Sequence, residues 1–280
     1  FRQVISFFYS ILEGRWTAED QARALVSIDI ADLQKFSKEL LSSISAKVLV
    51  AGNHQQDSLD RIIAQFDLIN FKDTVHASKV AKLEQSDIVR SIEIDHNDAV
   101  LIQYIQADND SIEERAIVGL LSQMISAPFY NQLRTEKQLG YVVSAFAMPI
   151  NRVPGICMLV QSPVATAVAL KSEFNVFNQG FSNQVENLSV EALAKHKRAL
   201  LINLEKSPDN LSELNSRHLQ SIKLGYVNFD FRDQLAASIR STSVGDIQTA
   251  YKRLVLNKPR RLWVKTSDKD TVNSQIKDDV

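Results

Sequence analysis

Residues 111–125 read Ser111-Ile-Glu-Glu-Arg-Ala-Ile-Val-Gly-Leu-Leu-Ser-Gln-Met-Ile125, and this stretch decides the fold class. Its apolar residues recur at the spacing of an α-helix that buries one face. Ser111 followed by Glu114 matches the capping box that starts a helix, so we expect the helix to begin there. We expect it to end at Pro128, because proline lacks the backbone N–H that a continuing helix needs.

Apolar runs of strand length flank this helix. The sequence predicts strands at residues 100–105, 141–147 and 156–161, and a closing strand at 261–265. The turn residues 95–98 predict that residues 92 and 94 pair with the first of these strands as a hairpin or a bulged meander. Helical spacing returns in several stretches between residues 165 and 254. Together these elements predict an α+β layer fold, with an antiparallel or mixed sheet and helices on one face.

A weak internal repeat relates the two ends of the chain. Each copy reads as a helix, a polar segment, a second helix and a strand, and the copies are 214 residues apart, from position 32 to position 246. The alternative is that any two helix-helix-strand stretches match this well by chance. The matched positions are Asp32-Leu33 with Asp246-Ile247, Leu40 with Leu254, and Lys47-Val48-Leu49-Val50 with Arg261-Leu262-Trp263-Val264.

The repeat, together with a stretch of mixed polarity at residues 70–91, predicts the domain organisation. We expect the C-terminal portion of one domain at residues 1–75, with the front half of that domain preceding Phe1. A complete homologous domain is expected at residues 76–267, followed by a polar tail at 268–280. The tail carries no fold signal and is expected to be disordered.

Charge and hydropathy exclude several classes of partner. The 280 residues contain 32 Lys and Arg against 33 Asp and Glu. This balance offers no excess positive charge for a nucleic-acid backbone, so we expect no nucleic-acid partner. The longest apolar runs are far shorter than the roughly 20 residues that a spanning helix needs, so we expect no membrane segment. A chain with 45% hydrophobic and 23% charged residues is typical of a globular fold.

The sequence lacks the motifs of common catalytic centres. Neither His-Glu-x-x-His nor its inverted form His-x-x-Glu-His occurs, and the five histidines are scattered, so we expect no metal site in this chain. Cys157, the one cysteine, lies in an apolar run without a basic neighbour. It is therefore interpreted as a buried structural thiol rather than a nucleophile.

One polar segment is unusual, at residues 128–143, where a helix runs through a glycine turn into a strand. Arg134 offers a fork of permanently charged donors, and Tyr141 offers a phenolic donor at the start of the strand. Such donors can grip a peptide carbonyl or stabilise an oxyanion. The structural alternative makes Arg134 the usual cation near a helix C-terminus and Tyr141 an amphipathic residue that starts a strand.

At this segment the chain resembles the inverzincin family of zinc metallopeptidases, peptidase family M16, of the insulin-degrading enzyme and pitrilysin type. The run Leu133-Arg-Thr-Glu-Lys-Gln-Leu-Gly-Tyr141 looks like the motif in that family's C-terminal half, and the strand that ends in Val160-Gln161-Ser162 is similar too. The likeness extends over the whole chain and is strongest at residues 100–162.

The resemblance implies a fold and a role. In that family, four homologous α+β domains form two halves around a closed chamber, and zinc is bound in the N-terminal half, which is not part of this sequence. The last domain contributes an arginine and a tyrosine that reach the substrate backbone at the cleavage site, at positions matched by Arg134 and Tyr141. Tyr130 matches an aromatic residue beside the scissile bond, where Phe is more usual. The implied partners are peptide substrates and the N-terminal half of the same polypeptide.

Two rival functions remain open at this level. The chain could belong to a non-catalytic scaffold with the same fold, or it could be a peptide-binding module. A periplasmic location is expected from the bacterial pitrilysins that the chain resembles, with a cytoplasmic location as the alternative implied by the eukaryotic relatives.

Overall fold

The structure is a computed structural model that describes residues 2–41, 44–66 and 79–267. Its contacts divide the chain into two compact units. The first comprises residues 1–15, 80–206 and 232–280, and the second comprises residues 16–79 and 207–231. The predicted tail at 268–280 and the predicted boundary between residues 75 and 76 both lie outside the described residues, so the domain limits stay a prediction.

The first unit is built on a mixed five-stranded sheet in the order β1-β5-β2-β4-β3. The strands are β1 (Asp87–Ile92), β2 (Ala99–Gln106), β3 (Val142–Ala147), β4 (Gly155–Ser162) and β5 (Arg260–Thr266). β1 pairs in parallel with β5, and all other neighbours are antiparallel. The predicted hairpin before β2 is therefore wrong, because β5 lies between β1 and β2.

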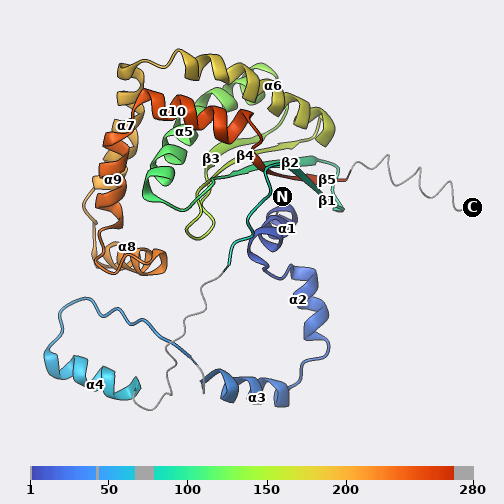
Figure 1. Ribbon diagram of the computed structural model, residues 1–280. Helices are drawn as coiled ribbons and strands as arrows, with labels where there is room; N and C mark the ends of the chain where they lie inside the picture. Colours follow the sequence, from blue (N-terminus) through green and yellow to red (C-terminus); the bar gives the residue numbers. More distant parts are fainter. Residues whose placement is uncertain (1, 42–43, 67–78, 268–280) are drawn as a thin grey trace, which may run out of the picture. The chain divides into compact units, whose positions relative to one another are not determined.

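Helices cover one face of this sheet, and one further helix covers the other (Figure 1). The helices over this face are α5 (Ile112–Tyr130), α6 (Ala167–Glu186) and α10 (Val244–Tyr251). The helices α7 (Val190–Glu205) and α9 (Phe231–Ser241) lie to the side of α5. Side chains alternate along the strands, so that Leu101 and Trp263 pack toward these helices while Ile102 and Leu262 point to the opposite face. The α+β class predicted from the sequence is confirmed.

The opposite face of the sheet is closed by α1 (Arg2–Glu13). Val4, Phe8 and Leu12 of this helix are fully buried among sheet residues such as Tyr104, whose ring meets that of Phe8 edge to face with 5.2 Å between the ring centroids. Although the sequence assigns residues 2–13 to a preceding domain, their apolar stripe completes the core of the first unit.

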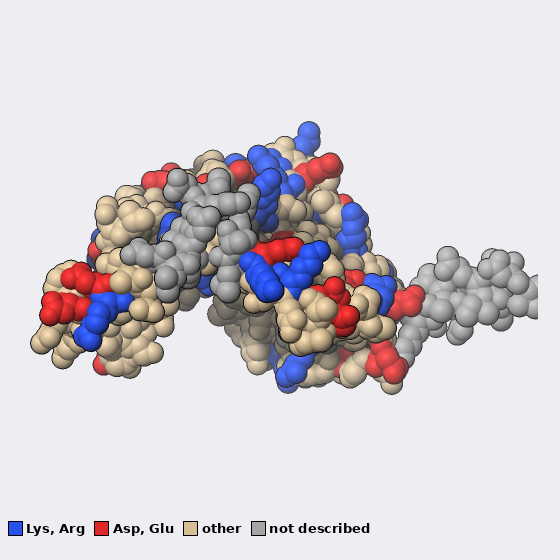
Figure 2. Space-filling view, turned by 90° about the horizontal axis from the view of Figure 1, so that it is seen from below, with Lys and Arg blue, Asp and Glu red and all other residues tan. Residues whose placement is uncertain are grey.

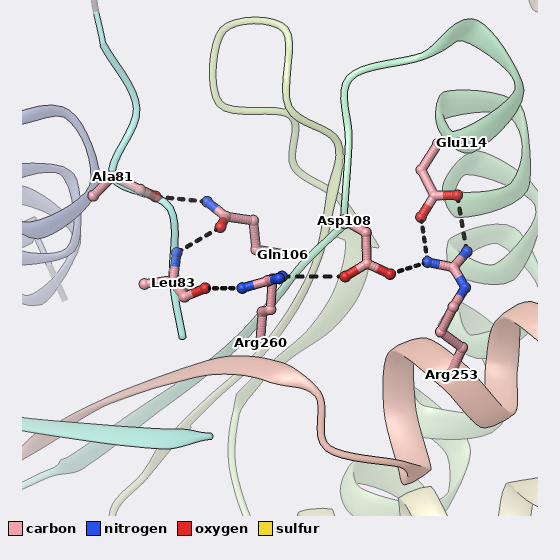
Figure 3. A network of polar contacts seen from close by, with 7 residues as sticks. All are labelled: Ala81, Leu83, Gln106, Asp108, Glu114, Arg253 and Arg260. Atoms are coloured by element: carbon pink, nitrogen blue, oxygen red, sulfur yellow. Dashed lines mark hydrogen bonds and ion pairs between the residues drawn. The ribbon is translucent and has the colours of Figure 1, made fainter. Parts of the chain in front are cut away.

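Partly buried ion pairs at one end of the sheet hold segments from distant parts of the sequence (Figure 3). Arg253 binds Glu114 through two hydrogen bonds of 3.0 and 2.9 Å and also pairs with Asp108. Asp108 in turn accepts a bond of 3.1 Å from Arg260, which donates to the Leu83 carbonyl. Figure 3 shows the segment before β1 fastened to the sheet through these groups.

The side-chain amide of Gln106 also binds the segment before β1. It donates to the Ala81 carbonyl at 2.9 Å and accepts from the Leu83 N–H at 2.8 Å.

Two local predictions about α5 are corrected by these contacts. Ser111 does accept a hydrogen bond from the Glu114 N–H at 3.2 Å, but the Glu114 carboxylate pairs with Arg253 and leaves the capping box half formed. The helix also continues past Pro128, because Phe129 and Leu133 are fully buried and hold the next turns against the core. Those turns end in a π-helical segment, η1 (Asn131–Glu136). A second such segment, η2 (Lys252–Leu256), follows α10.

The second unit contains α2 (Ala18–Leu25), α3 (Ile30–Leu41), α4 (Gln56–Phe66) and α8 (Leu211–Leu224). Residues 47–50, which the repeat predicts to be a strand, do not form one, and Val48 is 53% exposed. Its repeat counterpart, Leu262 of β5, is fully buried between two hydrogen-bonded strands. The prediction is wrong because a strand requires a paired neighbour, and residues 47–50 have none in the described part of the chain.

Candidate functional site

The segment from α5 through η1 to β3 carries all three predicted site residues. Phe129 and Leu133 anchor it by full burial. Gly140 then lies so close to β4 that a Cβ would overlap the Gln161 carbonyl oxygen and stand only 2.8 Å from Cγ1 of Val160. The glycine therefore lets the chain cross the end of β4 in close contact and enter β3 with Tyr141 beside Gln161.

Tyr141 lies at the mouth of β3 and is bonded to a carboxylate. The residue is half exposed, and its hydroxyl donates to Oδ2 of Asp98 at 2.6 Å. The same oxygen accepts a second bond of 2.9 Å from Nε2 of Gln161. Nδ1 of His96 lies 3.7 Å from the other Asp98 oxygen. Asp98 precedes β2, Gln161 belongs to β4 and Tyr141 precedes β3, so the group spans three adjacent strands at one end of the sheet.

The pair has a defined charge state at neutral pH. The hydrogen bond from Tyr141, together with that from Gln161, holds the pKa of Asp98 below its usual value despite some desolvation. The same bond raises the pKa of Tyr141. Asp98 is therefore a carboxylate and Tyr141 a neutral phenol, and the one phenolic hydrogen is engaged.

Tyr130 borders a groove beside the edge strand of the sheet. It is 46% exposed, and Phe146 on β3 is 40% exposed. Within the described residues no strand pairs with the outer edge of β3. The groove combines apolar and amide or hydroxyl groups, which suits an extended peptide. Its lining residues are Gln123, Ser126, Ala127, Tyr130, Asn131, Val143, Ser144, Ala145 and Phe146.

Arg134 lies on η1 with its side chain exposed. No hydrogen bond or ion pair joins its guanidinium to another residue that the structure describes, so its five donors face solvent. Neither Arg134 nor Tyr141 is among the residues that line the groove of Tyr130. The structure thus places the three predicted residues on one continuous segment without joining their side chains to one another.

Asp98 and Gln161 are the functional candidates that the sequence did not single out. The sequence places Asp98 only in a turn and Gln161 only in a strand. Gln161 pairs with Val100 of β2 and with Val142 of β3, and this register brings Gln161, Asp98 and Tyr141 together. The register depends on how the strands pair in the sheet.

The remaining chemistry is sparse. Burial raises the pKa of Cys157 to about 12, which confirms a buried structural thiol. Among the described residues no group of three or more His, Cys, Asp and Glu side chains is placed to bind a metal ion. None of the helices in this part of the chain combines the length and the apolarity that a membrane crossing requires. On the face drawn in Figure 2, basic and acidic side chains are interspersed.

Comparisons with known proteins agree with this fold. Residues 120–219 match the family described as PQQ synthase PqqF-like, C-terminal lobe domain 4. Human insulin-degrading enzyme is 27% identical over 266 residues, which cover 89% of this chain and 26% of that protein. The chain therefore spans about a quarter of the length of this curated relative.

Solved structures share the fold. The crystal structure of pitrilysin superposes with a TM-score of 0.82 at 22% identity, covering 94% of this chain and 29% of that one. A peptidase M16 inactive domain from Pseudomonas fluorescens superposes with a TM-score of 0.62 at 16% identity, covering 94% of this chain and 64% of that one.

Proposed function

Because its sequence and fold support an M16 peptidase C-terminal region, we propose that this chain is the non-zinc C-terminal part of a zinc metalloendopeptidase. It contributes substrate-binding and oxyanion-stabilising residues to a closed chamber in which peptides are degraded. The observation that carries the proposal is the exposure of both Arg134 and Tyr141 on the segment whose sequence resembles the family motif.

The division of labour follows from which groups each half holds. Zinc, bound by the N-terminal half, would polarise the attacking water there. The contribution of this chain is positioning and charge stabilisation. Arg134 donates to the substrate carbonyl through a planar fork, and the ring of Tyr130 contacts a side chain beside the scissile bond.

Tyr141 is assigned to the oxyanion that forms on the scissile carbonyl. A phenol has a single hydroxyl hydrogen, and in this structure that hydrogen forms a hydrogen bond to Asp98. Donation to the substrate therefore requires the hydroxyl to leave the Asp98 carboxylate. The half-exposed ring is free to make this small movement, because the phenol tip is not enclosed by the core.

Replacing the phenol tests this assignment. In the full-length protein that carries this chain, Tyr141→Phe is expected to lower turnover by about 10² to 10³, the usual loss for one oxyanion donor. Steady-state kinetics on a peptide substrate measure it, with Tyr226→Phe, a tyrosine of the second unit, as the matched control. Unchanged turnover of Tyr141→Phe removes the oxyanion role.

The groove beside β3 supports a second candidate, a peptide-binding module without catalysis. An edge strand with a free side pairs with extended peptides through main-chain hydrogen bonds. The sequence of the full-length protein distinguishes the two functions. A His-x-x-Glu-His helix in its N-terminal half supports the protease, and the absence of such a helix supports the binding module or a scaffold. A periplasmic location is proposed with either function, and a cytoplasmic one is the alternative.

A further inference from the structure

Asp98 is fixed in place by groups other than Tyr141. Its carboxylate side chain is only 12% exposed, lies at the start of β2 and accepts the 2.9 Å bond from Gln161. Gln161 is itself buried in β4. The carboxylate is therefore part of the rigid sheet, whereas the phenol that it binds is half exposed.

We propose that Asp98 holds Tyr141 in a resting position and competes with the substrate oxygen for the phenolic hydrogen. This inference rests on the proposed function of Tyr141 and adds a residue that controls it. Asp98 need not touch the substrate, so it is a positioning residue rather than a catalytic one.

The relative strength of the two acceptors decides when the Tyr141 hydroxyl moves its hydrogen bond from Asp98 to the substrate oxygen. Hydrogen bonds to an ionised acceptor are roughly twice as strong as neutral ones. The neutral carbonyl of a bound peptide is a weaker acceptor than Asp98 and leaves the phenol where it is. The oxyanion of the tetrahedral intermediate carries a full charge and competes with the carboxylate on equal terms. Tyr141 thus donates its hydrogen bond to the substrate only after the negative charge has formed on the substrate oxygen.

The first test concerns the contact alone and needs no catalysis. Ultraviolet absorbance of tyrosinate is followed against pH in the present chain, and the step that belongs to Tyr141 is isolated by subtracting the Tyr141→Phe titration. Asp98→Asn keeps the shape of the side chain and removes its charge. Tyr141 is expected to ionise at lower pH in Asp98→Asn than in the wild type. His96 is present in both proteins, so the difference reports Asp98. An unchanged Tyr141 step overturns the proposal.

The second test measures competition in the full-length protein. Asp98→Asn is expected to lower KM for a peptide by about 5-fold, because a neutral amide oxygen holds the phenol less firmly than a carboxylate by about 1 kcal/mol. Turnover should be equal to or above that of the wild type. The matched control is Asp95→Asn, which removes an exposed charge from the same turn and should leave KM unchanged. A lower turnover of Asp98→Asn, or an unchanged KM, overturns the competition.

The two proposals fail in distinguishable ways. If Tyr141→Phe retains both kinetic constants, Tyr141 has no role in the reaction, and the proposed function and the competition fall together. If Tyr141→Phe is impaired while Asp98→Asn binds the peptide no more tightly than wild type, Tyr141 keeps its role and only the competition is wrong.

Discussion

At the scale of single residues, Gly140 sets the position of Tyr141 through its close approach to β4. The backbone of Gln161 occupies the place that a side chain at position 140 would need. This approach also brings the phenol within reach of Asp98, which the same Gln161 binds through its side chain. One glutamine thus contacts the site through both its main chain and its amide.

Adding a methyl group at this point should disturb both fold and site. Gly140→Ala is expected to destabilise the protein by about 1–3 kcal/mol, the usual cost of overpacking a close contact. The control is Gly180→Ala in α6, where a Cβ meets nothing within 4 Å and helix propensity predicts a gain of about 0.5–1 kcal/mol. Urea unfolding midpoints compare the two variants. Equal stability of Gly140→Ala and wild type contradicts the packing argument.

Replacing Arg134 should have the opposite effect, lowering catalysis without changing the stability of the fold. Arg134→Ala in the full-length protein should raise KM and lower turnover, because a bidentate donor to the substrate backbone is lost. The free energy of unfolding should change by less than about 0.5 kcal/mol, since the exposed side chain has no partner among the described residues. Arg134→Lys should not restore the rate, because an ammonium lacks the planar fork. Kinetics equal to wild type favour the helix-terminal interpretation.

The residues of the site could be predicted from the sequence only in part. Arg134, Tyr141 and Tyr130 lie in one short run, where a motif can be recognised. Asp98 is 43 positions from Tyr141, and no local pattern links a turn aspartate to a distant phenol. Their contact depends on which strands are neighbours, and a single sequence does not fix that order.

At the scale of elements, helices were easier to predict than strand order. The cap at Ser111 and the apolar stripes locate helices, because these signals are local in the chain. The structure shows serine caps of the same kind at Ser189 and Ser243. The insertion of β5 between β1 and β2 depends on contacts across more than 150 residues, from Val100 to Thr266 for example. The strand predicted at residues 47–50 is wrong for the same reason, because a strand forms only with a paired neighbour, which local sequence does not reveal.

The ion-pair network of Figure 3 joins α5, η2 and the ends of β2 and β5, and it should be sensitive to the loss of one member. Arg253→Met leaves the Glu114 carboxylate, whose side chain is 7% exposed, without its bidentate partner. We expect a loss of about 1–3 kcal/mol, the usual cost of leaving a buried polar group unsatisfied, because Glu114 is buried while Arg253 is 38% exposed. The double variant Arg253→Met, Glu114→Met should recover much of that loss, because no uncompensated charge remains. Chemical unfolding measures both, and equal destabilisation of the two variants argues against the charge explanation.

At the scale of the whole molecule, the proposed function makes this chain a positioning surface and places the reaction centre in the other half of the enzyme. The described residues contain no cluster for a metal ion. If the proposed function is correct, the purified chain should bind no stoichiometric zinc and should leave peptides uncleaved. Metal analysis after dialysis and a peptide cleavage assay check this, and one equivalent of tightly bound zinc contradicts it.

The place of β5 in the sheet has a consequence for biosynthesis. β5 is the last strand along the described part of the chain, yet it fills the gap between the first two. While a ribosome is still translating the residues before 260, β1 has no neighbour to pair with, and one side of β2 stays open. A nascent polypeptide halted there presents unsatisfied strand edges, the kind of surface that chaperones shield from aggregation. Assembly of this sheet therefore waits for its final strand to leave the exit tunnel.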